Sequence, residues 1–193
     1  MTKSTEVPIL PFASKKKWAD WLAKEHEKST GVWLKLAKKD AGISSVTYEE
    51  ALDVALCYGW IDGQKKGFDD QYWLQKFTPR GPKSIWSKIN TEKAERLIAS
   101  GEMKPAGLRA IELAKQDGRW EAAYEGQKTI SVPEDFQAAL NKNKKAKEFF
   151  ATLNSVNRYA ILFRIHNAKK PETRAKWIQQ FVEMLERGQK LYS

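Results

Sequence analysis

The chain has 193 residues, of which 41% are hydrophobic and 11% aromatic. This length and composition suit one large domain, or a domain with a smaller appendage, and exclude wholesale disorder. No apolar run approaches the roughly 18 residues of a membrane-spanning helix, and residues 1–18 lack the continuous apolar stretch of a secretory signal. We therefore expect a cytoplasmic protein. The single cysteine, Cys57, excludes an intramolecular disulfide and a cysteine-based zinc cluster.

A formal net charge of +10 results from 34 Lys and Arg residues against 24 Asp and Glu residues. Most of this excess lies in the last third of the chain, because residues 138–193 contain twelve basic and four acidic side chains. A basic surface favours anionic partners such as nucleic acid, acidic lipid headgroups or an acidic protein. A solvated helical surface that keeps the protein soluble accounts equally well for the charge.

The first third of the chain predicts a helix, a strand and a second helix. Ser14 is the expected N-cap of the first helix. Alternating apolar positions at 31–39 then predict a short strand with one buried face. Thr47 and Glu50 form a capping box for the second helix, which Gly59 is expected to end.

Residues 60–79 predict a strand, a loop and a second strand paired in antiparallel fashion, with 67–70 as the tip of the hairpin. After Pro82 the pattern becomes helical. We expect Ser84 to cap a short helix and Thr91 to cap a following helix that ends at Gly101. The polar tip residues Asp69 and Asp70 are expected to serve the turn.

The rest of the chain is predicted to be helical, apart from an irregular stretch over 120–132. The later helices are expected to begin at or beside Pro105, Pro133, Asn143, Asn154 and Pro171. The last of them carries an apolar stripe formed by Trp177, Ile178, Phe181, Val182 and Leu185. The clearest candidate boundary is the stretch 124–133, which contains a glycine.

These patterns predict an α+β protein that is mainly helical. A small antiparallel sheet covered by helices is expected within a region spanning 1–125, followed by a helical C-terminal region spanning 126–193. Three tryptophans of the segment 58–90 are expected to gather where the sheet meets the helices, with Arg80 close by. They are Trp60, Trp73 and Trp86.

Standard catalytic motifs are missing from the sequence. There is no GxSxG elbow, HExxH or phosphate-binding glycine loop, and the glycines at 59–67 do not fit the dinucleotide fingerprint. The two histidines are expected at the surface of a lysine-rich helix (His26) and at a helix end (His166). We expect no metal and no cofactor.

A carboxylate is the better candidate for chemistry. Asp62 follows Ile61 on a strand that should be half buried, where burial can raise the pKa of a carboxyl group for acid–base work. The alternative is that Asp62 caps a turn or forms an ion pair with Lys65, Lys66 or Arg80.

The corner at 77–87 is the strongest candidate for an anion site. It combines Arg80 and Lys83 with the hydroxyls of Ser84 and Ser87 close to an expected helix start, and guanidinium groups and helix N-termini both bind anions. A rigid connection between sheet and helices is the alternative interpretation. The candidate ligand-binding residues of the whole segment are Trp60, Asp62, Trp73, Arg80, Lys83, Ser84, Trp86 and Ser87.

A second basic cluster flanks the turn before the last helix. Such a cluster can contact phosphates, although no groove-reading motif accompanies it. Its candidate residues are Arg158, Arg164, Lys169, Lys170 and Arg174.

Three stretches, EALDVALCYGWIDGQKK, LQKFTPRGPKSIWSKIN and GEMKPAGLRAIELAKQDGRW, together with the tail AKKPETRAKWIQQFVEMLERG, resemble the YdeI/OmpD-associated family of bacterial proteins, often labelled bacteriocin-protection. The resemblance runs from about Trp18 to Gly188. It implies a cytosolic bacterial protein with a YjbR/CyaY-like α/β fold in the N-terminal part and helices after it. The family name implies links to porins and stress, and the resemblance assigns no catalytic residue or cofactor.

The leading expectation is a non-enzymatic, stress-associated cytosolic protein that binds a small anion or an acidic partner. One alternative is an enzyme of unknown reaction that uses Asp62 with Arg80. Another is a nucleic-acid-associated protein that uses the basic C-terminal face. A protein of charge +10 repels cationic peptides, so any bacteriocin protection would be indirect.

Overall fold

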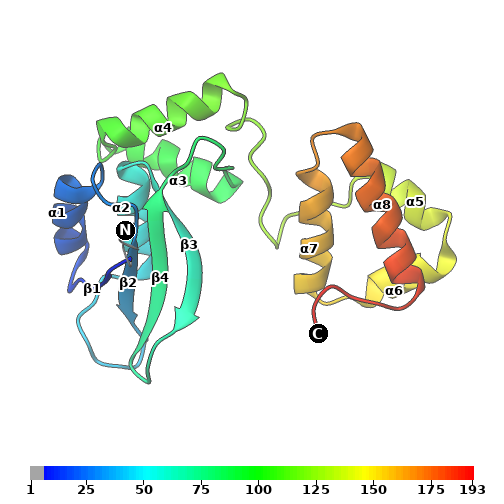
Figure 1. The fold of residues 1–193 in the computed structure, drawn as a ribbon, viewed down its shortest axis with the longest axis horizontal. Helices are drawn as coiled ribbons and strands as arrows, with labels where there is room; N and C mark the ends of the chain where they lie inside the picture. The colour runs from blue at the N-terminus through cyan, green and yellow to red at the C-terminus, as the bar shows by residue number, and fades with distance from the viewer. Residues whose placement is uncertain (1–6) are drawn as a thin grey trace, which may run out of the picture. The chain divides into compact units, whose positions relative to one another are not determined.

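The computed structural model describes residues 7–193 and confirms an α+β protein, with about 48% helix and 14% strand (Figure 1). The chain forms two compact units. The first comprises residues up to Trp86 together with Asn90–Ala122, and the second comprises Ser87–Ile89 together with Ala123–Ser193. The expectation of no secretory signal rests partly on residues 1–6, which lie outside the described residues.

Four strands form one sheet in the order β1-β2-β4-β3 (Figure 1). They are β1 (Ile9–Pro11), β2 (Val32–Ala37), β3 (Trp60–Gly67) and β4 (Tyr72–Pro79). The neighbours of β4 run antiparallel to it, as predicted, but β1 runs parallel to β2.

The expectation of an antiparallel sheet was therefore wrong at one edge, where residues 9–11 carry no strand pattern. The short strand β1 ends in a proline, and a proline is tolerated on an edge strand because no neighbour needs its missing N–H. The preceding carbonyl of Pro8 accepts a hydrogen bond from the amide of Trp33 at 2.8 Å, which ties this stretch to β2.

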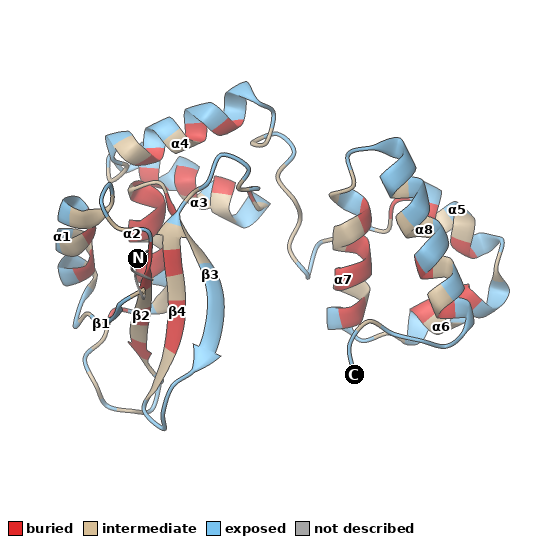
Figure 2. Ribbon diagram, viewed as in Figure 1, coloured by how far each residue is buried: buried red, intermediate tan, exposed pale blue. Residues whose placement is uncertain are grey.

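Helices α1 (Lys15–Glu25) and α2 (Tyr48–Cys57) cover one face of the sheet. The face of β2 toward them is fully apolar, because Val32, Leu34 and Leu36 are all buried. Trp18 of α1 is also buried, and its indole N–H donates to the carbonyl of Ala51 on α2 at 3.0 Å. Figure 2 shows buried residues along α2 and the middle of β4, and exposed ones along β3.

The predicted caps of these two helices are confirmed. The Ser14 hydroxyl accepts from the amide of Lys17, and Thr47 and Glu50 form the complete capping box. The glycine predicted to end α2, Gly59, has φ of 71°, a value that favours glycine over other residues.

Two further helices, α3 (Lys88–Ala99) and α4 (Pro105–Gln116), complete the helical part of this region. The prediction of a helix capped by Ser84 and another capped by Thr91 was wrong, since a single helix begins at Lys88 and runs through Thr91. The Ser84 amide donates to the carbonyl of Gly81 in a turn at 3.0 Å. The chain stays non-helical as far as Trp86, whose side chain is buried.

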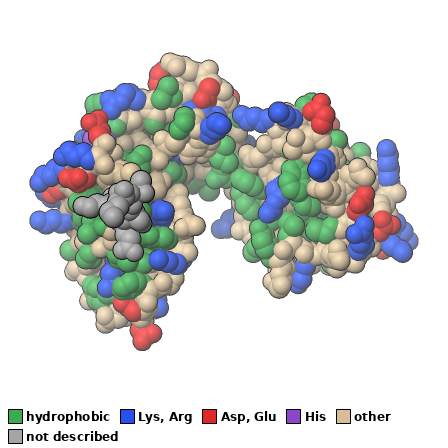
Figure 3. All heavy atoms as spheres, in the orientation of Figure 1, with side chains coloured by type: hydrophobic (Ala, Val, Ile, Leu, Met, Phe, Trp, Pro, Cys, Tyr) green, Lys and Arg blue, Asp and Glu red, His purple; other side chains and the backbone are tan. Residues whose placement is uncertain are grey.

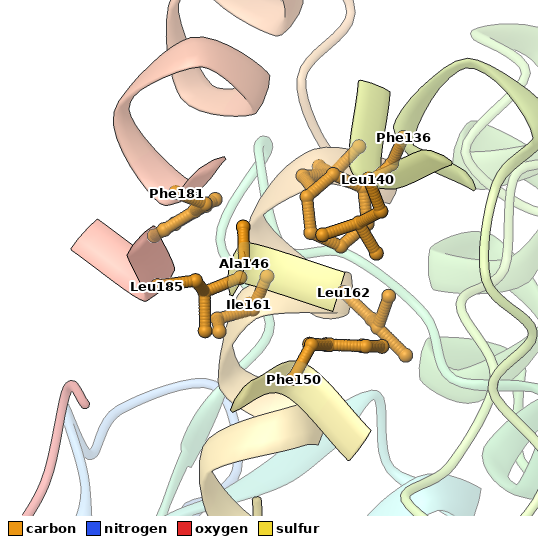
Figure 4. Close-up of a cluster of buried hydrophobic side chains, with 9 residues drawn as sticks. Phe136, Leu140, Ala146, Phe150, Ile161, Leu162, Phe181 and Leu185 are labelled. Atoms are coloured by element: carbon orange, nitrogen blue, oxygen red, sulfur yellow. The ribbon is translucent and has the colours of Figure 1, made fainter. Parts of the chain in front are cut away.

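The second unit contains α5 (Glu134–Asn141), α6 (Lys144–Thr152), α7 (Ser155–His166) and α8 (Pro171–Glu186). The predicted caps Asn143 and Asn154 each accept a backbone amide of the first helical turn. Figure 4 shows the core that these helices share, to which the predicted stripe of α8 contributes buried Phe181 and Leu185. The buried cluster comprises Phe136, Leu140, Ala146, Phe150, Ile161, Leu162, Ile165, Phe181 and Leu185.

The C-terminal segment of this unit is held by a buried amide. Asn157 is 1% exposed, and its side chain exchanges two hydrogen bonds with the backbone of Tyr192, at 2.8 and 3.1 Å. No helix within residues 7–193 combines the length and the apolar character needed to cross a bilayer.

Candidate anion-binding pocket

The corner after β4 places Arg80 flat against a tryptophan. The Arg80 guanidinium carbon lies 3.4 Å from the centre of the Trp86 ring, and its Nη1 donates to the carbonyl of Ile85 at 3.2 Å. Trp86 packs in turn edge-on against Trp120, with ring centroids 4.9 Å apart. The stack fixes the direction of the guanidinium group, because a planar cation over an indole face is attracted and loses rotational freedom.

Beside this stack lies a pocket of about 360 Å³, which falls in the size range of small-molecule sites. It is built from the C-terminal end of α1, the connection between α2 and β3, the corner after β4, and α4 with the residues that follow it. Its polar and aromatic lining consists of His26, Glu27, Tyr58, Trp60, Arg80, Arg109 and Arg119.

Positive charge predominates in this lining, because three arginines face one carboxylate. Glu27 lies 3.4 Å from Arg109 and 3.6 Å from the Nε2 of His26, so it offsets part of the charge. Arg119 is held rigidly, since its Nε donates to both oxygens of Asp117 and its Nη1 donates to the carbonyl of Ser84, each at 2.8 Å.

Two rings add hydrogen-bonding groups to the pocket. The rings of His26 and Tyr58 lie 5.1 Å apart, and Nδ1 of His26 bonds the Leu22 carbonyl at 2.8 Å, which requires a proton on that nitrogen. Burial raises the pKa of the Tyr58 hydroxyl. That hydroxyl therefore stays protonated at neutral pH and can donate to an anion.

Five of these lining residues were missed as site residues in the sequence: His26, Glu27, Tyr58, Arg109 and Arg119. His26 was expected at the surface, yet its side chain is only 19% exposed. Tyr58, Arg109 and Arg119 gave no signal of their own, because they lie far apart in the chain and only the packing of α4 beside the corner brings them together.

The predicted tryptophan cluster is only partly brought together. Trp60 lines the pocket and Trp86 carries the stacked Arg80. Trp73 lies at the other end of the strand pair, where it is paired with Gly67 and contacts Tyr48, with ring centroids 6.1 Å apart.

Asp62 and Arg80, the pair invoked for an enzyme, do not share the pocket. Asp62 pairs with Phe77 in the sheet, and one of its carboxylate oxygens accepts a hydrogen bond from the hydroxyl of Tyr48 at 2.8 Å. Its partner is therefore a phenol at the start of α2, and it is not one of the residues that line the pocket with Arg80.

The other residues of the predicted corner have separate places. Lys83 is exposed and does not line the pocket, and Ser84 contributes its carbonyl to Arg119. Ser87 belongs to the second unit, where it forms a bridge with Tyr124. The expected helix N-terminus at Ser84 does not exist, so an anion here would be bound by side chains.

The remaining polar candidates have structural roles. The carboxylate of Asp69 accepts the amides of Gln71 and Tyr72 at the hairpin tip, as a turn residue does. The lone thiol of Cys57 is buried, and burial raises its pKa to about 11, which makes it a poor nucleophile at neutral pH.

The predicted basic cluster of the second unit is only partly available to a ligand. Arg174 is engaged with Asp135 and with the carbonyl of Ile165, and Arg164 donates to the carbonyl of Ala160. Arg158 stacks on Phe150, with its guanidinium carbon 4.6 Å from the ring centre. The two exposed members of the cluster are Lys169 and Lys170.

Two larger hollows make weaker candidates for a polar ligand. One, of about 600 Å³, lies between α5 and α8, and its main charged pair, Asp135 and Arg174, is already joined. The other, of about 550 Å³, is an apolar groove between α3 and α4 that includes Leu108 and Leu113. The described part of the chain contains no group of three or more His, Cys, Asp and Glu side chains placed to hold a metal ion.

The fold and the site thus define an α+β protein with a cationic, aromatic pocket in its first unit. Residues 10–110 match a family model described as a domain of unknown function (DUF8412), and residues 129–188 match the family described as bacteriocin-protection, YdeI or OmpD-associated. Because the first match covers just over half of the chain, the chain belongs to the DUF8412 family, and it carries a YdeI/OmpD-associated segment after that domain.

The second match confirms part of the resemblance seen in the sequence. That resemblance was expected to run from about Trp18 to Gly188, whereas the YdeI/OmpD-associated match is confined to the C-terminal segment. The expected YjbR/CyaY-like character of the first part gains no support from these matches and stays a prediction. Comparisons with the curated proteins and with the solved structures gave no match.

Proposed function

We propose that this is a cytosolic, non-enzymatic protein whose first unit binds a small organic anion, carrying a carboxylate or a phosphate, in the pocket beside Arg80. The observation that carries the proposal is that three arginines line one pocket of about 360 Å³ together with the aromatic rings of Tyr58 and Trp60. Guanidinium groups bind carboxylates and phosphates through paired, charge-assisted hydrogen bonds, and the rings supply apolar contact for the rest of the ligand.

The three arginines have different parts in the proposed site. Arg119 is anchored by Asp117 and the Ser84 carbonyl, so it provides a fixed positive field. Arg80 presents a guanidinium whose plane is set by Trp86. The side chain of Arg109 is 63% exposed, and within the described residues its ion pair is the 3.4 Å contact with Glu27, which leaves it able to close on a ligand.

Thermal-shift measurements on the full chain test this function, with inorganic phosphate, pyrophosphate, citrate and a nucleoside monophosphate as probes. We expect at least one probe to raise the melting temperature in a saturable way. A ligand at a hundred times its Kd stabilises the native state by about 2.7 kcal/mol, which is a shift of several degrees for a protein of this size.

Substitutions separate the pocket from its surroundings. Arg80→Ala and Arg109→Ala should each weaken binding of that probe by about tenfold or more, because a hydrogen bond to a charged group contributes roughly 1.5–3 kcal/mol. Lys83→Ala is the matched control, since Lys83 is a cation of the same corner that does not line the pocket. The proposal fails if no probe shifts the melting temperature, or if Lys83→Ala weakens binding as much as Arg80→Ala.

A role in stress or bacteriocin tolerance, which the family description suggests, would in this view follow from the bound anion. The net charge of +10 supports an anionic rather than a cationic ligand. Binding measured in the full chain is therefore the first step, and a role in cells would be tested with Arg80→Ala, once that variant is shown to fold.

A further inference from the structure

The sheet has a second face, opposite the one that α1 and α2 cover. Side chains alternate along a strand, so Trp33 and Lys35 of β2 point away from the helix-facing Val32, Leu34 and Leu36. The register pairs Trp33 with Lys76 and Lys35 with Leu74. The aromatic–lysine face, as we call this surface, consists of Trp33, Lys35, Lys66, Phe68, Tyr72 and Lys76.

On this face every lysine lies close to an aromatic ring. The ammonium of Lys66 is 4.3 Å from the centre of the Trp33 ring, and that of Lys76 is 5.8 Å from it. Lys35 lies between two other rings, 4.0 Å from Tyr72 and 4.6 Å from Phe68. Rings and ammonium groups therefore alternate over the middle of the sheet and the hairpin tip.

The surface is accessible and carries an excess of positive charge. Phe68 is 47% exposed, and Trp33, Lys35, Tyr72 and Lys76 are partly exposed. The nearby carboxylate is Asp69, which lies 3.8 Å from Lys35 and is engaged by two backbone amides of the turn. In Figure 3, hydrophobic and basic side chains lie intermixed over the strands of the first unit.

This combination fits a polymer that alternates flat rings with anions. A base that stacks on an exposed aromatic side chain contributes about 1–3 kcal/mol, whereas a lysine over the same ring at an exposed site contributes about 0.5–1 kcal/mol. A nucleobase can therefore displace Lys66 from the Trp33 ring. The displaced ammonium of Lys66 can then pair with a phosphate within reach of its flexible side chain. The exchange therefore adds both a stacking contact and an ionic contact.

The partner is expected to be single-stranded. In a duplex the bases are stacked on each other and cannot reach a ring on the protein, and a sheet face carries no helix to enter the major groove. Unpaired bases can be laid on the aromatic residues in succession, with the backbone running past the lysines.

We propose that the aromatic–lysine face binds single-stranded nucleic acid by stacking bases on Trp33 and Tyr72 and by pairing phosphates with Lys35, Lys66 and Lys76. This site is separate from the anion pocket, whose lining includes none of these residues. It also differs from the basic cluster of the second unit, to which the sequence had assigned any binding of nucleic acid.

Fluorescence anisotropy with a labelled fifteen-nucleotide oligothymidylate tests the proposal on the full chain. We expect binding at 50 mM NaCl that weakens steeply toward 200 mM, because phosphate contacts release counterions. Trp33→Leu and Tyr72→Leu should each weaken binding by about tenfold or more. The double variant Lys66→Gln/Lys76→Gln should also flatten the slope of log K against log salt by about 1.4, or 0.7 for each lost contact.

Two matched control variants test where on the protein the nucleic acid binds. Trp73→Leu removes an aromatic residue of the same strand from the opposite face, and Lys169→Gln/Lys170→Gln removes two exposed charges from the second unit. Both variants should bind as the natural protein does. Absence of binding at 50 mM NaCl overturns the proposal. So does equal competition by a duplex of the same length, or a greater loss in the Lys169 and Lys170 variant than in the Lys66 and Lys76 variant.

Discussion

Gly107 of α4 shows how the absence of one side chain sets the approach of two helices. A Cβ atom at this position would collide with the carbonyl oxygen of Cys57 and lie 2.8 Å from that of Leu56, both at the end of α2. Backbone atoms cannot move aside as a flexible side chain can. Glycine here allows α4 to pack directly on the carbonyl end of α2, which is what brings Ala106 and Arg109 to the pocket.

Gly107→Ala should therefore destabilise the protein, although alanine is the better helix former. The gain in helix propensity is about 1 kcal/mol, and overpacking typically costs about 1–3 kcal/mol. The middle of that range exceeds the gain, so we expect a net loss of about 1 kcal/mol in the free energy of unfolding, measured by urea denaturation. Gly67→Ala is the control, because a Cβ there meets nothing within 4 Å, and it should change stability by less than about 0.5 kcal/mol. A Gly107→Ala protein as stable as the natural one would contradict this account.

The candidate site was predictable at this scale only in part. Arg80 was identified because its guanidinium accompanies Lys83 and serine hydroxyls close to an expected helix start, and that helix start does not exist. One alternative from the sequence paired Arg80 with Asp62. The structure places Asp62 beside Tyr48 instead, a contact that could not be predicted because the two residues come from separate elements. A register shift in the strand pair between Asp62 and Lys65 further alters the alternation on which such an expectation depends.

At the scale of elements, an arginine fork joins three helices of the second unit. Arg174 of α8 donates to both oxygens of Asp135 on α5, at 2.6 and 2.9 Å, and to the carbonyl of Ile165 near the end of α7, at 2.7 Å. A planar guanidinium can make these bonds together, whereas an ammonium cannot reproduce their geometry.

Arg174→Lys should lower the free energy of unfolding by about 1–2 kcal/mol, even though the charge is kept, because the bidentate pair and the bond to Ile165 are lost together. Urea denaturation measures the effect. Lys176→Ala, an exposed cation two residues along the same helix, should leave stability nearly unchanged. Equal effects of the two substitutions would mean that the fork adds nothing to stability.

The same fork predicts a dependence on pH. The hydrogen bond from Arg174 holds the pKa of Asp135 below its usual value, so the unfolded chain takes up the proton first as pH falls. The stabilisation is complete above the ordinary carboxyl pKa of about 3.9 and is lost as pH falls through the lower pKa of the folded state. The difference in unfolding free energy between the natural protein and Asp135→Asn should therefore be larger at pH 6 than at pH 3. A difference that grows on acidification would contradict the assignment.

At the scale of the whole molecule, each compact unit has its own core. Leu34 is fully buried in the sheet of the first unit, and Leu140 is 1% exposed in the helical cluster of the second. Two separate cores predict that the two units unfold in separate cooperative transitions, because a core mutation mainly destabilises the groups packed around it.

Leu140→Ala should lower the melting temperature of one calorimetric transition, and Leu34→Ala should lower that of another. Each truncation is expected to cost about 2–5 kcal/mol within its own unit, because a buried leucine loses its contacts and leaves a cavity. Binding of an anion should raise the transition that Leu34→Ala lowers. A single transition that both substitutions shift equally would show that the two units unfold together.

The sequence by itself determined most of the element boundaries and the fold class. Caps such as Ser14, Thr47 and Asn154 act within one turn of a helix, and the alternation along β2 is set by a period of two, so a single sequence carries these signals. Only the tertiary structure decided the parallel edge strand, the late start of α3, the arginine-lined pocket and the aromatic–lysine face. Each of these depends on side chains from separate elements meeting through strand register and helix packing, and such contacts leave no periodic trace along the chain.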